Sequence, residues 1–417
     1  LNQIEAERLL KVWPVGVVPK TRLWFEENVG QAHLYNVQAA LRLAPGDQPR
    51  LNLSYEFAEA QVRMLRTLPP VLNARGHAVL EGKTYTATLN KGYILAPEGG
   101  QIEADGTVFQ IKDITARPML TRLEIQSKSS LTATLSLLDQ EPFSFFSKAG
   151  QPVNLGDGRA ELHSTLLLPI KPGVQLEEVE FNVSGRIVDF TSPALVAGRI
   201  LTSPEVEVAV DTDGLTLAGQ GKLDDMPIDL TYRQGFGPEQ KGKARIDGTV
   251  ILSDPILRDF GVELPEGSVA GEGPAAIDIA LNGDLPPQLT LTSTLAGLAL
   301  RFDALSWTKD AETKGSLDLE ARLEREPIVE RMALTAPGLS AEGRITTVEG
   351  GGLGEARFER VVAGDWLDAP VLLTGNGSGK LPSVAVTGGT LDMRRMPDDS
   401  GAVVAIDPWT GDVLVFA

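Results

Sequence analysis

The sequence contains no cysteine. Disulfide bonds, thiolate nucleophiles and cysteine-ligated metal sites are therefore excluded for these residues. Lysine and arginine are also scarce: 38 basic residues stand against 56 acidic ones, which gives a formal charge of −18. A nucleic-acid groove needs clustered Lys and Arg, and no such cluster occurs. The same balance disfavours docking to an anionic membrane surface.

Long apolar runs are missing as well. The longest, at residues 165–170, is interrupted by Pro169 and is far shorter than the roughly 18 residues that span a bilayer. We therefore expect no membrane anchor and no signal peptide within these residues. Because the chain begins at Leu1 and ends in an apolar run at Ala417, we expect it to be a piece of a longer protein.

Strict alternation of apolar and polar residues is the main pattern that is present. A period of two places alternate side chains on opposite faces of a sheet, and one apolar face with one wet face is typical of antiparallel strands. With 43 Gly and 27 Pro, the composition favours many short strands and turns over long helices. The alternating segments are 51–57, 131–137, 206–210, 277–281, 289–295 and 317–323.

Turn and helix signals punctuate these segments. Asp-Gly and Asn-Gly pairs, which tolerate positive φ, follow several strands and predict hairpins, among them one at residues 211–214. We expect only four short helices, and a terminal strand–turn–strand hairpin at 402–417. The expected helices are 19–29, 58–67, 141–149 and 255–260.

No catalytic pattern is complete in the sequence. His33, His77 and His163 have no second histidine at metal-ligand spacing, so we interpret them as structural. Residues 375–380 imitate a phosphate loop but lack its first Gly and its Ser or Thr, and residues 211–214 imitate a calcium loop that lacks its last acid. Residues 306–309 match Ser-x-x-Lys without a Lys-Thr-Gly partner. We expect neither an enzyme nor a cofactor or metal.

Dispersed motifs across residues 10–396 resemble the central region of the AsmA-like group, in particular its YhdP-type bridge proteins of Gram-negative envelopes. The N-terminal block is the most specific part. The motifs are Trp13-Pro14, 19–25, Glu27-Asn28, 63–65, 68–70, Gly76, 80–82, 85–89, Gly92, 166–169, 214–223, 364–366 and 388–392.

This resemblance implies a mostly β fold in which a long curved antiparallel sheet forms an open apolar groove, with a few short helices. It implies a non-enzymatic phospholipid conduit across the periplasm from the inner to the outer membrane, supporting outer-membrane lipid homeostasis. Both membranes would be reached through parts outside this chain. We divide the chain into an N-terminal β-rich part of the groove at 1–150, a continued groove at 151–396 and the terminal hairpin at 397–417.

Apolar residues of the alternating segments are the candidate lining of the groove, because acyl chains need an aliphatic wall. The same alternation would also suit a structural or binding β-sandwich or β-solenoid, and a cell-wall enzyme fragment is a third possibility. The candidates are Leu51, Leu53, Leu131, Leu135, Leu137, Val206, Val208, Val210, Leu215, Leu217, Ile277, Ile279, Leu281, Leu289, Leu291, Leu317 and Leu319.

Overall fold

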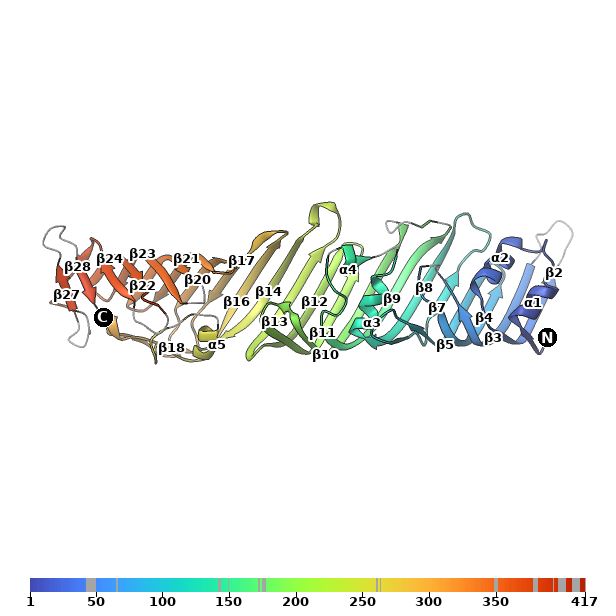
Figure 1. Ribbon diagram of the computed structural model, residues 1–417, viewed down its shortest axis with the longest axis horizontal. Coiled ribbons are helices and arrows are strands. Elements are labelled where there is room, and N and C mark those ends of the chain that lie inside the picture. Colours follow the sequence, from blue (N-terminus) through green and yellow to red (C-terminus); the bar gives the residue numbers. More distant parts are fainter. Residues whose placement is uncertain are drawn as a thin grey trace. The chain divides into compact units, whose positions relative to one another are not determined.

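A computed structural model gives the fold of the chain (Figure 1). About 60% of its residues are in strands and 11% in helices, and the strands pair antiparallel, so the prediction of a mostly β antiparallel fold is confirmed. The structure describes residues 1–42, 50–64, 67–141, 144–148, 150–171, 173–174, 178–259, 262, 264–348, 352–377, 382–392, 394–396, 403–406 and 413–416.

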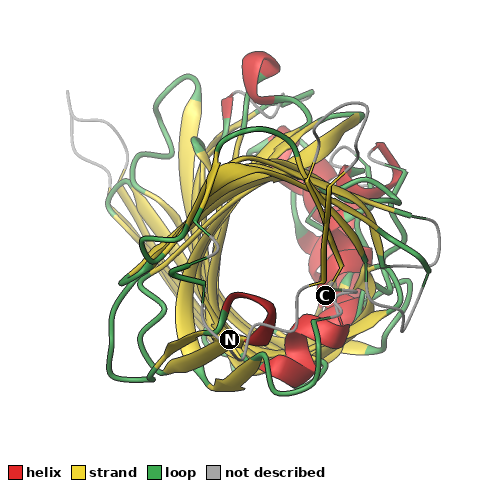
Figure 2. Cartoon of the chain, turned by 90° about the vertical axis from the view of Figure 1, so that its left-hand side faces the viewer, coloured by secondary structure: helices red, strands yellow, loops and turns green. Residues whose placement is uncertain are grey.

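The chain divides into two compact units, Leu1–Gly221 and Lys222–Ala417. The boundary that the sequence suggested, after residue 150, falls inside the first unit. Each unit is built around strands that are curved rather than flat (Figure 2).

Strands of the first unit form an antiparallel meander in which neighbours in sequence are mostly neighbours in the sheet. The short strand β6 pairs with both β5 and β8. The strands are β1 (Gln3–Glu5), β2 (His33–Arg42), β3 (Arg50–Val62), β4 (Val71–Glu81), β5 (Thr84–Leu95), β6 (Gln101–Glu103), β7 (Val108–Ile111), β8 (Met119–Ser130), β9 (Asp157–Ile170), β10 (Glu180–Val196), β11 (Arg199–Asp211) and β12 (Gly214–Leu223).

Helices of the first unit are α1 (Ala6–Val12), α2 (Pro19–Asn28), α3 (Leu131–Leu138) and α4 (Phe145–Lys148). The prediction at 19–29 is confirmed by α2, which places Pro19 in its first turn, where a missing N–H costs nothing. The prediction at 141–149 is met only by the single turn of α4.

The helix predicted at 58–67 is wrong, because strand β3 continues to Val62. A β-bulge interrupts the alternation: Glu59 adopts φ 53°, and the register shifts between Phe57 and Ala60. One extra residue in a strand breaks the period of two, so the alternation of apolar and polar residues that indicates a strand is interrupted here.

The strand predicted at 131–137 is also wrong, because these residues form α3. Ser130 accepts a hydrogen bond from the Ala133 amide and so caps the helix at its start. Leu131 and Leu135 are four residues apart, which fits a helical face as well as a strand face. The capping serine was the signal that could have decided between the two.

The second unit repeats the meander. The predicted helix at 255–260 is met by α5 (Asp254–Asp259). The strands of this meander in the second unit are β13 (Met226–Gly235), β14 (Lys243–Leu252), β16 (Gly273–Asn282), β17 (Leu285–Ser293), β20 (Ser316–Arg322), β21 (Ile328–Ala336), β22 (Leu339–Thr347), β23 (Leu353–Ala363), β24 (Leu367–Thr374), β25 (Ser383–Val386), β26 (Thr390–Leu391), β27 (Val403–Ile406) and β28 (Val413–Phe416).

A separate three-stranded sheet belongs to the second unit and consists of β15 (Val269–Gly271), β18 (Leu298–Phe302) and β19 (Trp307–Lys309). It supplies buried side chains such as Leu298, Leu300 and Trp307. The predicted terminal hairpin is met by β27 and β28, which pair antiparallel, while its turn at 407–412 lies outside the described residues.

The chain exposes far more surface than a compact fold would. Its accessible surface is 24814 Å². Two separate compact domains that shared this mass would together expose about 19,000 Å². The chain therefore buries a smaller share of its surface than compact domains of this size.

Candidate functional site: the apolar sheet faces

One face of the sheet in the first unit is apolar across successive strands. Directly paired residues point to the same face, so the register traces it strand by strand. One row begins at Tyr55 and ends at Phe181. This row is Tyr55, Ala78, Ala87, Phe109, Leu123, Leu166 and Phe181.

The candidate residues of β3 and β11 lie on this same face. Leu53 lies two residues before Tyr55 on β3, and so on the same face, and it is paired with Leu80. Val210 is paired with Val183, which is two residues from Phe181 on β10. We call this surface, which also includes Leu51, Val206 and Val208, the unit 1 face.

Leu215 and Leu217 are two residues apart on β12, so they share one face of that strand, and both are half-buried. Ion-paired and polar side chains occupy the intervening positions of β9, β10 and β11. The alternation therefore sorts apolar from polar side chains, as the sequence predicted for residues 206–210 of β11.

Leu131, Leu135 and Leu137 are not part of the sheet, which corrects the prediction. They belong to α3, and Leu131 forms a buried cluster with Ile187 and Phe190 of β10. Leu135 packs against that cluster together with Val206 and Val208 of β11. Helix α3 thus lies on the unit 1 face and covers Ile187 and Phe190, whereas Val206 and Val208 beside the cluster remain half-buried.

A second helical cover lies at the N-terminal strands. Ala6 of α1 forms a buried cluster with Ala60 of β3 and Ala74 of β4, and Phe25 of α2 packs against it. Between the two covered areas the residues of the row from Phe109 to Phe181 remain half-buried.

The second unit has its own apolar face, and every candidate residue there belongs to it. Ile277 is paired with Leu291, and Leu291 with Leu319; in the adjacent rows Ile279 is paired with Leu289, and Ser293 with Leu317. Leu281 is paired with Ala244. We call this surface the unit 2 face.

Sequence patterning missed the far half of the unit 2 face. The register extends from Leu319 to Met332, then through Gly343 to Phe358 and Val371. β-Bulges shift the register within β20–β21, β21–β22 and β23–β24, which breaks the alternation in the sequence.

A polar pair interrupts the unit 1 face. The Tyr55 and Tyr85 hydroxyls are hydrogen-bonded at 2.8 Å. Burial raises the pKa of Tyr55, and the neighbouring Tyr85 hydroxyl raises it further. Burial also raises the pKa of Tyr85, against the lowering effect of the hydrogen bond. Both phenols therefore have a pKa above the ordinary tyrosine value, and that of Tyr55 is raised well above it.

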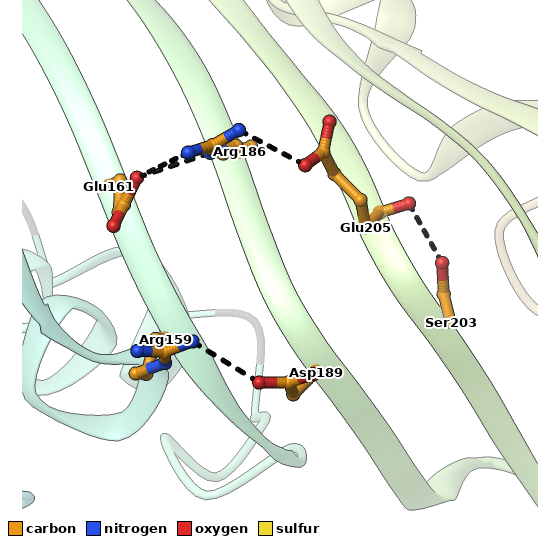
Figure 3. Close-up of polar contacts among 6 residues, drawn as sticks. All are labelled: Arg159, Glu161, Arg186, Asp189, Ser203 and Glu205. Atoms are coloured by element: carbon orange, nitrogen blue, oxygen red, sulfur yellow. Dashed lines mark hydrogen bonds and ion pairs between the residues drawn. The ribbon is translucent and has the colours of Figure 1, made fainter.

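The opposite, polar face carries charge ladders, one of which is drawn in Figure 3. Arg186 of β10 contacts Glu161 of β9 at 3.0 Å and Glu205 of β11 at 3.2 Å. The hydrogen bond from Arg186 lowers the pKa of Glu161. These residues line a shallow, open depression of about 540 Å³. Each charge is paired and exposed, so the ladder fits a solvated sheet face and offers no general base or nucleophile.

The other motifs are accounted for by local structure. Asp211 Oδ1 accepts hydrogen bonds from the amides of Asp213 and Gly214, as a hairpin turn requires. His77 and His163 are exposed and His33 is half-buried. The described residues hold no group of three or more His, Asp or Glu side chains placed to bind a metal ion.

The Ser-x-x-Lys match at residues 306–309 is explained by the burial of its lysine, Lys309. Lys309 is 4% exposed, and its Nζ donates hydrogen bonds to the carbonyls of Leu295 and Leu298 at 2.7 Å each and of Asp310 at 3.1 Å. All three ammonium protons are thus used within the protein, which ties β19 to the loop after β17. The loop at 375–380 falls partly outside the described residues.

Comparison with known proteins gives no relative: no family model, no curated protein and no solved structure matches the chain. Among the described residues, no helix is both long and apolar enough to cross a bilayer. The two apolar faces are therefore the features of this chain that bear most directly on its function.

Proposed function

We propose that the chain is a non-enzymatic phospholipid conduit of the Gram-negative envelope, working in the periplasm between the inner and outer membranes. The observation that carries the proposal is the row-by-row continuity of apolar side chains on each face, which the chain's own packing leaves half-buried from Phe109 to Phe181 on the unit 1 face and at Ile277, Leu291 and Leu319 on the unit 2 face. In this proposal acyl chains lie along the faces and polar headgroups remain in water.

The energetics support such a role. Each acyl CH₂ exposed to water costs about 0.8 kcal/mol, so a free two-chain lipid crosses an aqueous gap slowly. A wall of Leu, Val and Ile removes much of that cost. It also makes no directional bonds, so a chain can slide without being held at one position.

The alternative is a structural or binding β-protein without lipid transport. A β-solenoid stacks parallel strands, whereas the strands here pair antiparallel. A sandwich would pack a second sheet against the apolar face. Among the described strands outside the large sheet, only β15, β18 and β19 form another sheet, and they are too short to cover a face of this extent. These features favour the conduit.

A photo-crosslinking experiment in a Gram-negative host tests the proposal. A photoreactive amino acid at Val208 or Leu291 is expected to crosslink phospholipid. The matched controls are the neighbours Glu207 and Thr290, which point to the polar face and should give no lipid adduct. Absence of adducts at Val208, Leu291 and several further positions of both faces would contradict the conduit.

A further inference from the structure

The hydrogen bond between Tyr55 and Tyr85 joins two strands that are not neighbours in the sheet. Tyr55 is on β3 and Tyr85 is on β5, and β4 lies between them. The hydroxyl oxygens are 2.8 Å apart, so the two side chains meet above β4. The β4 residues paired with them are Ala78, opposite Tyr55, and Leu80, opposite Tyr85, which are 0% and 9% exposed. The two hydroxyls therefore lie on the unit 1 face itself.

The two phenols hold more hydrogen-bond donors than the pair can use. Each tyrosine hydroxyl carries one proton, and the bond between them uses one of the two. In the part of the chain that the structure describes, neither hydroxyl has another hydrogen-bond partner. One O–H group therefore remains available as a donor, whichever tyrosine donates to the other.

The side chains around this donor are almost all apolar. In the two rows that contain Tyr55 and Tyr85, the other polar residue is Thr121, and its hydroxyl already donates to the Gln110 carbonyl at 3.0 Å. Burial raises the pKa of both phenols, so the hydroxyls keep their protons at neutral pH. The row of Tyr85 is Leu53, Leu80, Tyr85, Ile111, Thr121 and Leu168.

The chemistry of the pair selects the ligand that fits it. Neither tyrosine is fully covered by the protein: both are half-buried, as are Leu53 and Phe109 beside them. An O–H group without a partner in apolar surroundings costs free energy, which a ligand that brings an acceptor recovers. On an aliphatic face that acceptor should be uncharged, because a charged group would lose its hydration there. The ester carbonyl of a phospholipid, which is bonded directly to an alkyl chain, has this chemistry.

We propose that the Tyr55–Tyr85 pair is a subsite for the ester carbonyl of a phospholipid acyl chain, which accepts a hydrogen bond from the unused phenolic proton. The subsite rests on the conduit function proposed above and adds to it a position at which the lipid is held. The aliphatic neighbours of the pair make no directional bond. The lipid therefore pauses with its ester group above β4 and its acyl chain along the unit 1 face.

Competition between ester-linked and ether-linked lipid tests this proposal. A radiolabelled short-chain diacyl phosphatidylcholine, kept below its micelle-forming concentration, is bound to the purified chain. It is then displaced by the same lipid without label or by its dialkyl ether counterpart. The ether lipid lacks both carbonyls, so the diacyl lipid should compete about three- to tenfold better, the effect of one neutral hydrogen bond. This preference should disappear in the double variant Tyr55→Phe/Tyr85→Phe.

Single substitutions distinguish the subsite from a purely structural pair. In Tyr55→Phe or Tyr85→Phe the remaining hydroxyl keeps its proton, so each single variant should retain the preference. A pair that only joined β3 to β5 would be broken equally by either single substitution and by both together.

Tyr232→Phe is the matched control. Tyr232 is half-buried on the unit 2 face, where it is paired with Ile246 and through it with Ile279. Its hydroxyl proton is already used, because it donates to Gln234 Oε1 at 2.8 Å. The control should retain the preference for the diacyl lipid, and circular dichroism should show that all variants are folded.

The outcomes separate the subsite from the conduit. Equal competition by the ester and ether lipids in the unchanged chain would overturn the subsite and leave the conduit standing. A preference that survives the double substitution, or that either single substitution abolishes, would also overturn the subsite alone. Absence of binding by both lipids would overturn the conduit and the subsite together.

Discussion

At the scale of single residues, the face residues differ from core residues in how much of their environment is protein. Leu291 is half-buried on the unit 2 face, whereas Leu298 in the three-stranded sheet is buried. Both are leucines in strands of the same unit. Period-two alternation identified Leu291, but it could not distinguish a residue facing an uncovered surface from one facing a packed core.

This difference predicts unequal costs for the same substitution. Leu291→Asp should lower the free energy of unfolding by only about 1–2 kcal/mol, because the carboxylate can remain hydrated at a face with no covering layer. Leu298→Asp should cost on the order of 4 kcal/mol or more, because it buries an unpaired charge. Urea unfolding followed by circular dichroism measures both. Equal, large losses would indicate that the unit 2 face is a closed core.

The tyrosine pair gives a second residue-scale prediction. A folded-state pKa above the unfolded value means that the pair's contribution is intact below about pH 10 and is lost as the pH rises further. The urea midpoint should therefore fall more steeply above pH 10 for the unchanged chain than for the Tyr55→Phe/Tyr85→Phe variant. Parallel decline of the two proteins would show that the hydroxyls are not held neutral by burial.

At the scale of elements, α3 is one of the features that sequence patterning missed. Its docking depends on the loop between β5 and β6: Ser136 Oγ donates to the Glu98 carbonyl at 2.9 Å, and Ser130 Oγ donates to the Gly99 carbonyl at 2.8 Å. These contacts join segments more than 30 residues apart, so no local pattern could have revealed them. Regularly alternating stretches such as residues 51–57 of β3, by contrast, could be predicted because their alternation is local.

Two adjacent glycines allow the effect of a steric contact with α3 to be distinguished from the effect of a positive φ. Gly99 and Gly100 both have positive φ, but a Cβ on Gly99 would lie 2.4 Å from the Ala133 amide of α3, whereas one on Gly100 would meet nothing within 4 Å. Gly99→Ala should therefore destabilise the chain by at least about 1 kcal/mol more than Gly100→Ala. Hydrogen exchange of the α3 amides should accelerate only in Gly99→Ala. Equal exchange in the two variants would contradict this account of how α3 is held.

At the scale of the whole molecule, the accessible surface of 24814 Å² is the main departure from an ordinary globular protein. Composition could not predict this, because the same fraction of apolar residues also builds closed sandwiches. The polar faces compensate in part, since ladders such as Glu161–Arg186–Glu205 keep the outward side soluble. The division at Gly221 was likewise not visible in the sequence, where β12 reads as one uninterrupted strand.

The absence of cysteine makes the central claim directly measurable, because any single introduced cysteine can be labelled selectively. A fluorophore is attached in turn at each position from 205 to 210 on β11, and phospholipid with a nitroxide quencher on its acyl chain is added. The account predicts strong quenching at Val206, Val208 and Val210 and little at Glu205, Glu207 and Ala209. Quenching that is absent, or uniform along the strand, would contradict the claim that acyl chains lie on the unit 1 face.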